Sequence, residues 1–283
     1  MKEIQITTRD NYNLIGYHFK PEESNKKVVL INPATGVKQR FYFKFANFLS
    51  SKGFDVITYD YRGIGLSKNK SLKEFDASMK DWAQKDFGAL TEYLNQNFKQ
   101  HNKILIGHSF GGNSIGMASN AGDFDAYITI ASQFGYWKYF NTIYKPVLLW
   151  VFYFIMPILS NLYGYFPSKV KQLGENLPKG VAKDWITLIT HPNSMLELTN
   201  ETGNYYNSVK KPMLMISFSD DQMAPKKAVD ELSSRVYSNA IVERQHIKAN
   251  KSKPIGHMNY FRKQFESDLW NIPTNWIKTL ELK

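Results

Sequence analysis

The sequence predicts an α/β fold in which one mostly parallel sheet of eight strands carries helices on both faces. Two observations lead to this prediction. Short apolar runs alternate with longer segments of helical spacing along most of the chain, and 283 residues are enough to bury one large core. The runs expected to form strands are residues 3–7, 14–19, 28–32, 56–60, 104–107, 126–130, 213–218 and 240–247.

Two segments between these runs have the apolar spacing of helices that cover a sheet. The first covers residues 41–49 and ends before Gly53, and the second covers residues 79–94. Asp86 lies on the apolar stripe of the second segment. Asp86 precedes Ser109, the candidate nucleophile described below, and it does not lie in a loop after a later strand, where the candidate acid is expected. We therefore expect Asp86 to be a hydrogen-bonded structural residue.

The alternation stops between the sixth and seventh predicted strands. The sequence therefore predicts three parts: residues 1–134 form the first part of the core, residues 135–206 form a helical cap, and residues 207–283 complete the core.

The first half of the predicted cap is unusually aromatic and contains an apolar run over residues 147–156. A membrane span needs about 20 apolar residues, and we expect Pro157 to interrupt this run, so no span is predicted. Three roles remain open: packing the cap onto the core, lining a pocket for a substrate's apolar part, and peripheral contact with a membrane. The expected substrate contacts are Tyr136, Trp137, Trp150, Phe154 and Met258.

Residues 107–111, which read Gly-His-Ser-Phe-Gly, follow a buried-strand run and precede a small, helix-compatible segment. This Gly-x-Ser-x-Gly pattern is typical of a nucleophile elbow, a sharp strand-to-helix turn that exposes a serine hydroxyl. Ser109 is therefore the candidate nucleophile. His108, beside it, is expected to pack under the turn.

A serine hydroxyl becomes a useful nucleophile when a histidine takes its proton and an acid orients that histidine. The candidate acid is Asp221, after the strand run 213–218, because Pro225 follows it at the spacing of a loop that opens the next helix. Asp220 is the competing choice. The candidate base is His257, which follows the last predicted strand in a Pro-Ile-Gly-His turn.

Four segments together resemble those of bacterial α/β hydrolases. These are residues 32–42, residues 59–67 (Tyr-Asp-Tyr-Arg-Gly-Ile-Gly-Leu-Ser), residues 174–178 (Gly-Glu-Asn-Leu-Pro) and residues 256–258 (Gly-His-Met). They resemble a group of predicted serine hydrolases of unassigned substrate, and the chain is more distantly similar to monoacylglycerol lipases and serine aminopeptidase-type hydrolases. The resemblance implies an α/β-hydrolase fold with a helical cap inserted after the sixth strand.

The resemblance also implies an oxyanion hole made of two backbone N–H groups. The first is that of Phe110, directly after the nucleophile. The second is that of Thr35, obtained by aligning residues 33–36 (Pro-Ala-Thr-Gly) on the His-Gly-x-Gly loop of the lipases. Ala34 is the alternative donor.

The amino-acid composition limits the possible nucleophiles, cellular locations and binding partners. The chain has no Cys, so neither a disulfide nor a thiolate nucleophile exists, and the first thirteen residues are too polar for a signal peptide. Cytoplasm is the expected location. The net charge is +11, but 36 Lys and Arg are interleaved with 25 acids, which favours a solvated surface over nucleic-acid binding. No metal or cofactor motif is present, so neither is expected.

These residues predict a serine hydrolase that cleaves a moderately apolar, lipid-like or aromatic carboxylic ester through an acyl-enzyme, with a small-molecule ester as its partner. Acyl transfer, thioester hydrolysis and amide hydrolysis use the same triad and remain alternatives. A non-catalytic ligand-binding protein that retains the fold is the alternative from another class.

Overall fold

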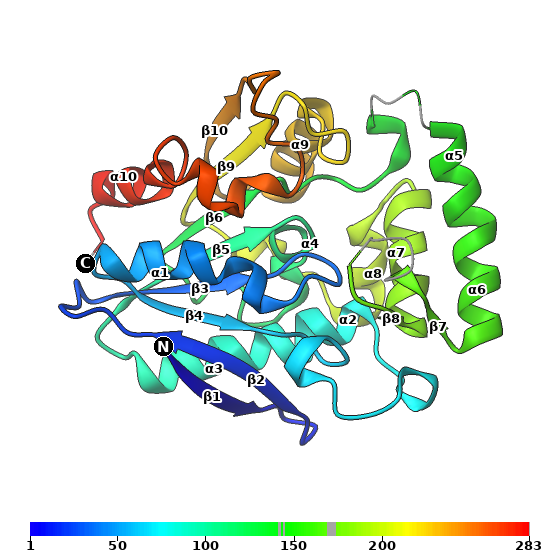
Figure 1. Ribbon diagram of the computed structural model, residues 1–283, viewed down its shortest axis with the longest axis horizontal. Helices are drawn as coiled ribbons and strands as arrows, with labels where there is room; N and C mark the ends of the chain where they lie inside the picture. Colours follow the sequence, from blue (N-terminus) through cyan, green and yellow to red (C-terminus); the bar gives the residue numbers. More distant parts are fainter. Residues whose placement is uncertain (141–142, 144, 169–173, 283) are drawn as a thin grey trace.

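The computed structural model describes residues 1–140, 143, 145–168 and 174–282. Its centre is an eight-stranded sheet of order β1-β2-β4-β3-β5-β6-β9-β10 (Figure 1). Strands β1 and β2, and β2 and β4, are antiparallel, whereas every other neighbouring pair in this sheet is parallel. The strands are Lys2–Thr7 (β1), Asn13–Phe19 (β2), Lys27–Asn32 (β3), Asp55–Tyr59 (β4), Asn102–His108 (β5), Ala126–Ile130 (β6), Pro212–Phe218 (β9) and Ile241–Ile247 (β10). All eight predicted strands are confirmed.

The sheet has an apolar core on each of its two faces. In β3, Val28 and Leu30 belong to one buried cluster and Val29 and Ile31 to the other, because successive side chains of a strand point to opposite faces. A strand buried on both sides reads as a continuous apolar run, which explains why the central strands lack alternation.

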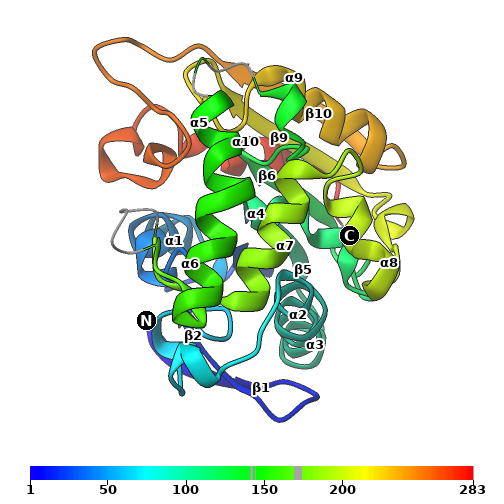
Figure 2. The same cartoon turned by 90° about the vertical axis from the view of Figure 1, so that its right-hand side faces the viewer.

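Helices cover both faces, as the fold class requires. Figure 2 shows α1 (Phe43–Ser51) on one side of the strands and α2 (Met79–Asp81) with α3 (Gly88–Asn97) on the other. Helix α10 (Asn271–Thr279) lies on the same side as α1, because both contribute to one buried cluster. The second predicted helical stripe is one continuous helix, in which the π-helical segment Trp82–Phe87 (η4) joins α2 to α3. Ser78 begins it with a capping box, because its hydroxyl accepts from the N–H of Asp81.

The remaining helical elements and turns connect these strands or follow the last of them. The helices are Phe110–Asn113 (α4), Lys145–Trp150 (α5), the π-helical Val151–Ile155 (η7), Met156–Tyr163 (α6), Lys179–Thr190 (α7), Met195–Thr202 (α8), Lys226–Glu231 (α9) and the π-helical Leu232–Val236 (η10). Turns of 3₁₀ type are Gln39–Tyr42 (η1), Gly65–Ser67 (η2), Leu72–Glu74 (η3), Ile115–Met117 (η5), Trp137–Tyr139 (η6), Tyr206–Ser208 (η9), Asn259–Phe261 (η11) and Lys263–Phe265 (η12).

Helices α5 to α8 all come between β6 and β9 in the chain. In both cartoon views α5, α6 and α7 lie together beyond one end of the sheet (Figures 1 and 2). Tyr165–Phe166 (β7) and Leu177–Pro178 (β8) form a two-stranded antiparallel sheet in the same region. Two-residue strands are too short to produce a sequence pattern, so they were not predicted. The division of the chain at residues 135 and 206 stays a prediction.

The expected interruption at Pro157 is wrong, because the helix continues from Lys145 to Tyr163 over 19 residues. Proline has no N–H to donate to the carbonyl group four residues earlier in an α-helix. Here Pro157 is the second residue of α6, and α6 directly follows the π-helical segment Val151–Ile155. The missing N–H therefore falls where the hydrogen bonds change from the π-helical to the α-helical pattern. Gly164, with a φ of +77°, ends the helix.

Candidate active site

Ser109 lies at the turn between β5 and α4 with a φ of 50° and a ψ of −117°, a backbone conformation rare for a residue with a side chain. The flanking glycines make this turn fit. A Cβ on Gly107 would lie 2.5 Å from the Cα of Gly112, and a Cβ on Gly111 would lie 2.1 Å from the carbonyl oxygen of Asn32. Because these neighbours are backbone atoms, no side-chain rotation would relieve the clash.

The structure brings Ser109, His257 and Asp221 together although they are far apart in the sequence. The Oγ of Ser109 lies 2.9 Å from Nε2 of His257, and Nδ1 of the same ring lies 2.9 Å from Oδ2 of Asp221. Ser109, Asp221 and His257 follow the carboxyl ends of the parallel strands β5, β9 and β10 respectively, and such ends meet at one edge of a sheet. The arrangement is that of a serine, a base that can take its proton and an acid that orients the base.

Asp221 is buried and is held ionised by hydrogen bonds. Burial by itself would raise the pKa of this carboxyl, but His257 and the N–H groups of Met223 and Ala224, at 2.8 and 2.9 Å, together hold the pKa below its ordinary value. Asp220 has a different role in the structure, since it accepts from the N–H groups of Ile255 and Gly256 at 2.8 and 3.0 Å. It therefore fixes the loop that carries the histidine.

A buried chain of three hydrogen bonds under the turn, called the relay below, connects three parts of the site. The N–H of Ala34 donates to the hydroxyl of Tyr42 at 3.0 Å, that hydroxyl donates to Nδ1 of His108 at 2.9 Å, and Nε2 of His108 donates to the carbonyl of His257 at 2.9 Å. Burial lowers the pKa of His108 to about 3, which keeps the ring neutral and able to accept from Tyr42. The predicted place of His108 under the turn agrees with this relay, whereas the contact made by Tyr42, the last residue of the segment 32–42, was not predicted.

The relay also distinguishes between the two candidate donors of the oxyanion hole. The N–H of Ala34 is already used by Tyr42. Within the described ranges, neither the N–H of Thr35 nor that of Phe110 donates to a protein acceptor, and both residues line the cavity beside Ser109. Thr35 and Phe110 are therefore the donors that an oxyanion at this place could use.

A mostly apolar cavity of about 220 Å³ opens beside the serine. Its lining consists of Ala34, Thr35, Val37, Ser109, Phe110, Asn113, Gln133, Phe140, Leu148, Phe152, Gly174, Trp185, Leu188, Ile189, Met223, His257 and Met258. Of the five expected substrate contacts, Met258 lies in this lining. A cavity lined by apolar and aromatic side chains with a few polar groups is typical of a small-molecule site.

The other four expected contacts do not line this cavity, and their role as substrate contacts stays a prediction. Trp150 and Phe154 are 56% and 57% exposed and lie on the outer side of their helix. Tyr136 and Trp137 are half-buried and pack edge-to-face against each other at 5.9 Å.

The helix Lys145–Tyr163 presents Leu148 and Phe152 to the cavity instead. These two residues are four apart and share one helix face, whereas Trp150 lies between them in sequence and points away. Both faces of this helix are apolar, so hydrophobic spacing gave no signal for which one turns inward.

Among the residues that the structure describes, no group of three or more His, Cys, Asp or Glu could hold a metal ion. The expectation of no cofactor stays a prediction.

Fold and site together define an α/β hydrolase. Residues 23–249 match the model of the Hydrolase_4 family, described as serine aminopeptidase, S33, and the chain belongs to that family. The matched range contains Ser109 and Asp221, while His257 follows it.

Solved structures similar to this chain include several esterases. An esterase from Pyrococcus furiosus has a TM-score of 0.65 at 20% sequence identity, covering 98% of this chain and 90% of its own. A highly thermostable carboxyl esterase from Bacillus coagulans, in complex with glycerol, has a TM-score of 0.65 at 15% identity, covering 99% of both chains. An esterase domain from Rhodothermus marinus has a TM-score of 0.59 at 14% identity, covering 98% of both. At these identities the likeness shows the fold. Comparison with curated protein sequences finds no match.

Proposed function

We propose that this protein is a serine hydrolase that cleaves a carboxylic ester with an apolar acyl part through a covalent acyl-enzyme. The observation that carries the proposal is the pair of 2.9 Å hydrogen bonds linking Ser109, His257 and Asp221 at the wall of a mostly apolar cavity. Membership of an α/β-hydrolase family supports the same class of reaction.

In the first step the Oγ of Ser109 attacks the substrate's carbonyl carbon, and its proton passes to Nε2 of His257. Asp221 stabilises the imidazolium that forms and keeps the ring in the required orientation. The negative oxygen of the tetrahedral intermediate accepts from the N–H groups of Thr35 and Phe110. Collapse breaks the bond to the leaving group, which takes the proton from His257. Water then attacks the acyl-enzyme in the same way and releases the acid.

Three further uses of the same triad, namely thioester hydrolysis, amide hydrolysis and acyl transfer, stay as alternatives. Thioesters and amides have the same carbonyl geometry, and acyl transfer replaces the attacking water by a second alcohol or amine. A protein that keeps the fold and only binds a ligand would react with no serine-directed reagent.

The test is intact-mass analysis after treatment with a fluorophosphonate, comparing the wild type with Ser109→Ala. We expect one adduct on the wild type and none on the variant. A p-nitrophenyl ester series of increasing chain length then measures how much acyl group the cavity accepts. No adduct and no ester turnover by a folded wild-type protein would contradict the proposal.

We also propose that the outer face of the helix Lys145–Tyr163 contacts an anionic membrane surface peripherally. By length and composition this helix is long and apolar enough to cross a membrane, and only 17% of it is buried. The exposed apolar residues on it are Val147, Trp150, Tyr153, Phe154, Ile158, Leu162 and Tyr163. Residues 126–168 contain two Lys, Lys138 and Lys145, and no Asp or Glu, a balance that favours an anionic lipid surface over a zwitterionic one.

Vesicle cosedimentation tests this contact. We expect the wild type to bind vesicles containing phosphatidylglycerol, and the triple variant Trp150→Ser/Phe154→Ser/Ile158→Ser to lose most of that binding. The matched control replaces Met223 and Ile241, exposed apolar residues elsewhere, by Ser. Equal binding of all three proteins, or a wild-type dimer in sedimentation velocity that the triple variant abolishes, would contradict membrane contact. The cytoplasmic location stays a prediction, which cell fractionation tests.

A further inference from the structure

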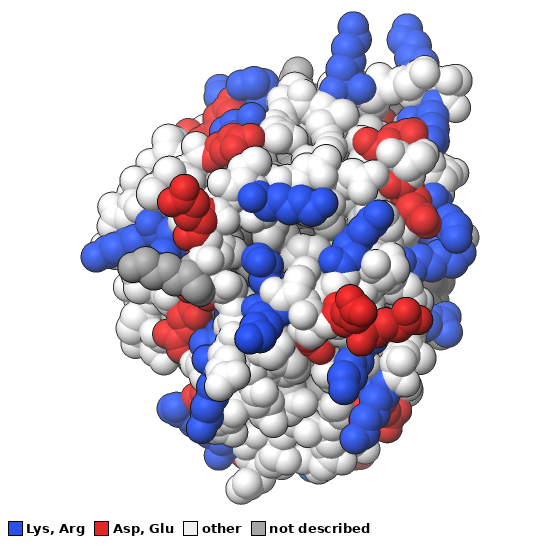
Figure 3. Space-filling model, turned by 90° about the vertical axis from the view of Figure 1, so that its left-hand side faces the viewer, with Lys and Arg blue, Asp and Glu red and all other residues white. Residues whose placement is uncertain are grey.

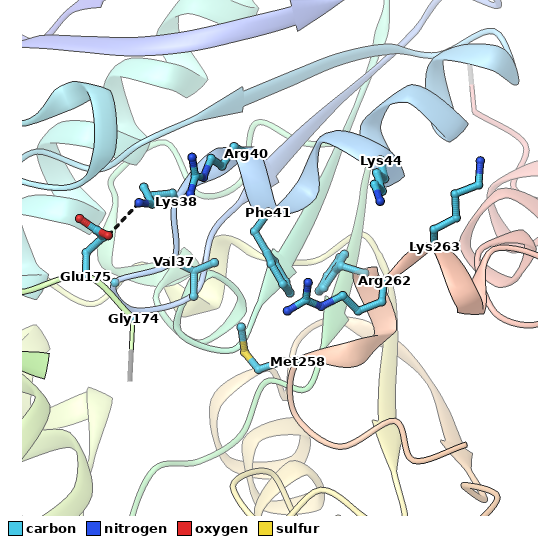
Figure 4. A pocket seen from close by; sticks show the side chains of 12 residues that line it. Val37, Lys38, Arg40, Phe41, Lys44, Gly174, Glu175, Met258, Arg262 and Lys263 are labelled. Carbon is cyan, nitrogen blue, oxygen red and sulfur yellow. Dashed lines mark ion pairs between the residues drawn. The ribbon is translucent and has the colours of Figure 1, made fainter. Parts of the chain in front are cut away.

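A second hollow, a groove of about 780 Å³, lies beside the catalytic cavity and is lined by cationic side chains. Figure 4 shows this groove between the turn before α1 and the segment that follows His257. Its lining consists of Gly36, Val37, Lys38, Arg40, Phe41, Lys44, Gly174, Glu175, Met258, Phe261, Arg262 and Lys263. Five of these twelve residues are Lys or Arg and one is acidic.

Most of these charges lack an acidic counterpart. The Nζ of Lys38 pairs with Glu175 at 2.8 Å, and Lys263 lies 3.7 Å from Glu266. In the part of the chain that the structure describes, Arg40, Lys44 and Arg262 make no ion pair with an acid. By contrast, cationic and acidic side chains are interspersed over the face drawn in Figure 3.

Arg262 is held in place by an aromatic ring. Its Cζ lies 5.0 Å from the centre of the Phe41 ring, a cation–π contact. In Figure 4 its guanidinium points toward the space between Phe41 and Met258, whereas Lys263 points away from it. The planar guanidinium is therefore presented to the groove, and this group binds carboxylate and phosphate oxygens through two parallel hydrogen bonds.

The groove and the catalytic cavity are neighbours, because Val37, Gly174 and Met258 line both. The leaving group of an ester must lie beside His257, since it takes its proton from that ring. Met258 directly follows His257, so the leaving group is the part of a bound substrate that is nearest to the groove. The acyl part then occupies the apolar cavity beside Leu148 and Phe152.

We propose that this groove binds an anionic group, phosphate or carboxylate, carried by the alcohol or thiol that leaves in the reaction. The proposal rests on the proposed function, because that function defines which part of the substrate faces His257. The substrate class that follows is an ester or thioester with an apolar acyl chain and an anionic leaving group.

The test separates binding from turnover by using folded Ser109→Ala protein and ether analogues that cannot be cleaved. The ligands are 1-O-octylglycerol, which is neutral, its 3-phosphate, and 3-O-octylglycerate, which carries a carboxylate. We expect at least one anionic ligand to bind roughly tenfold more tightly than the neutral one in calorimetry, because each exposed ion pair contributes modestly and three cations act together. The phosphate and carboxylate arms distinguish which anion is preferred.

The groove variant is the same Ser109→Ala protein with Arg40→Gln, Lys44→Gln and Arg262→Gln added. We expect it to bind all three ligands with similar affinity, close to that of the neutral one. A matched control removes three charges outside the groove by Lys2→Gln, Lys20→Gln and Lys278→Gln, and it should keep the preference. Raising the salt concentration should reduce the preference as well.

Equal affinity for neutral and anionic ligands, or the same loss in the control variant, would overturn the proposal. Such a result leaves the proposed function intact if wild-type protein still reacts with the fluorophosphonate and hydrolyses neutral esters. Conversely, unreactive Ser109 with a retained anion preference would refute the hydrolase and keep the groove as a binding site.

Discussion

His108 should make the stability of this protein depend on pH in the mildly acidic range. The ring is buried, its Nδ1 accepts from Tyr42, and burial lowers its pKa from 6.5 to about 3. Protonation would place a charge in the core and remove the acceptor that Tyr42 uses. In the unfolded chain the same ring titrates at its ordinary value.

Whether acidification stabilises or destabilises the folded protein depends on which state, folded or unfolded, binds more protons. Between pH 6.5 and about 3 the unfolded state binds a proton on His108 and the folded state does not, so stability falls as the pH is lowered through this range. Each pH unit costs about 1.4 kcal/mol. The contribution of His108 is therefore absent at pH 8 and amounts to a loss of about 2 kcal/mol at pH 5.

The perturbation is His108→Gln, which keeps a hydrogen-bonding side chain and removes the titration. The assay is urea unfolding followed by tryptophan fluorescence at several pH values between 5 and 8, for wild type and variant. His257 and Asp221, whose charges act on His108, are present in both proteins, so their effects largely cancel in the difference. We expect the variant to be less stable at pH 8 and to lose about 2 kcal/mol less than the wild type on acidification to pH 5. Equal pH dependence of the two proteins would refute the argument.

Five further substitutions, in three tests, probe other parts of the site. Asp221→Asn should lower kcat for a p-nitrophenyl ester by ~10³–10⁴, because the histidine loses its orienting acid, while Asp220→Asn should cost less than about tenfold, because it binds only the neighbouring loop; equal losses would contradict the assignment. Gly111→Ala should destabilise the fold by more than ~3 kcal/mol, because its Cβ would lie 2.1 Å from a backbone oxygen, and an unchanged melting temperature would exclude this packing. Leu148→Trp should reduce kcat/KM for long-chain esters relative to short ones, because it fills the cavity. Trp150→Ala, on the outer face, should leave the chain-length profile unchanged, and a similar shift in both variants would contradict the inward direction of Leu148.

The fold and the three side chains brought together at the site were predictable because they depend on local patterns. The elbow needs glycines at fixed offsets from Ser109, and parallel strands buried on both faces leave apolar runs such as that of β5. The chain order of serine, acid and histidine placed Asp221 and His257 in loops after later strands. No knowledge of packing was needed for these assignments.

The substrate contacts were not predictable in the same way. The helix that contains Trp150 and Phe154 is apolar on all sides, so its sequence has no polar face to mark solvent. Its rotation is decided by which side chains fit against α7 and the cavity. For that reason four of the five expected contacts do not line the cavity, whereas Met258, fixed by its position next to His257, does.

By itself the sequence determined the α/β architecture, the strand order along the chain, the turn at Ser109 and which aspartate and histidine lie beside that serine, because backbone geometry and hydrogen-bonding chemistry restrict which residues can occupy those positions. Only the tertiary structure decided that Tyr42 and His108 connect the oxyanion loop to the histidine, that Leu148 and Phe152 face the cavity, and that Arg40, Lys44 and Arg262 line one groove. These arrangements join residues from different elements, and the packing of whole helices and loops, which no local pattern encodes, brings them into contact.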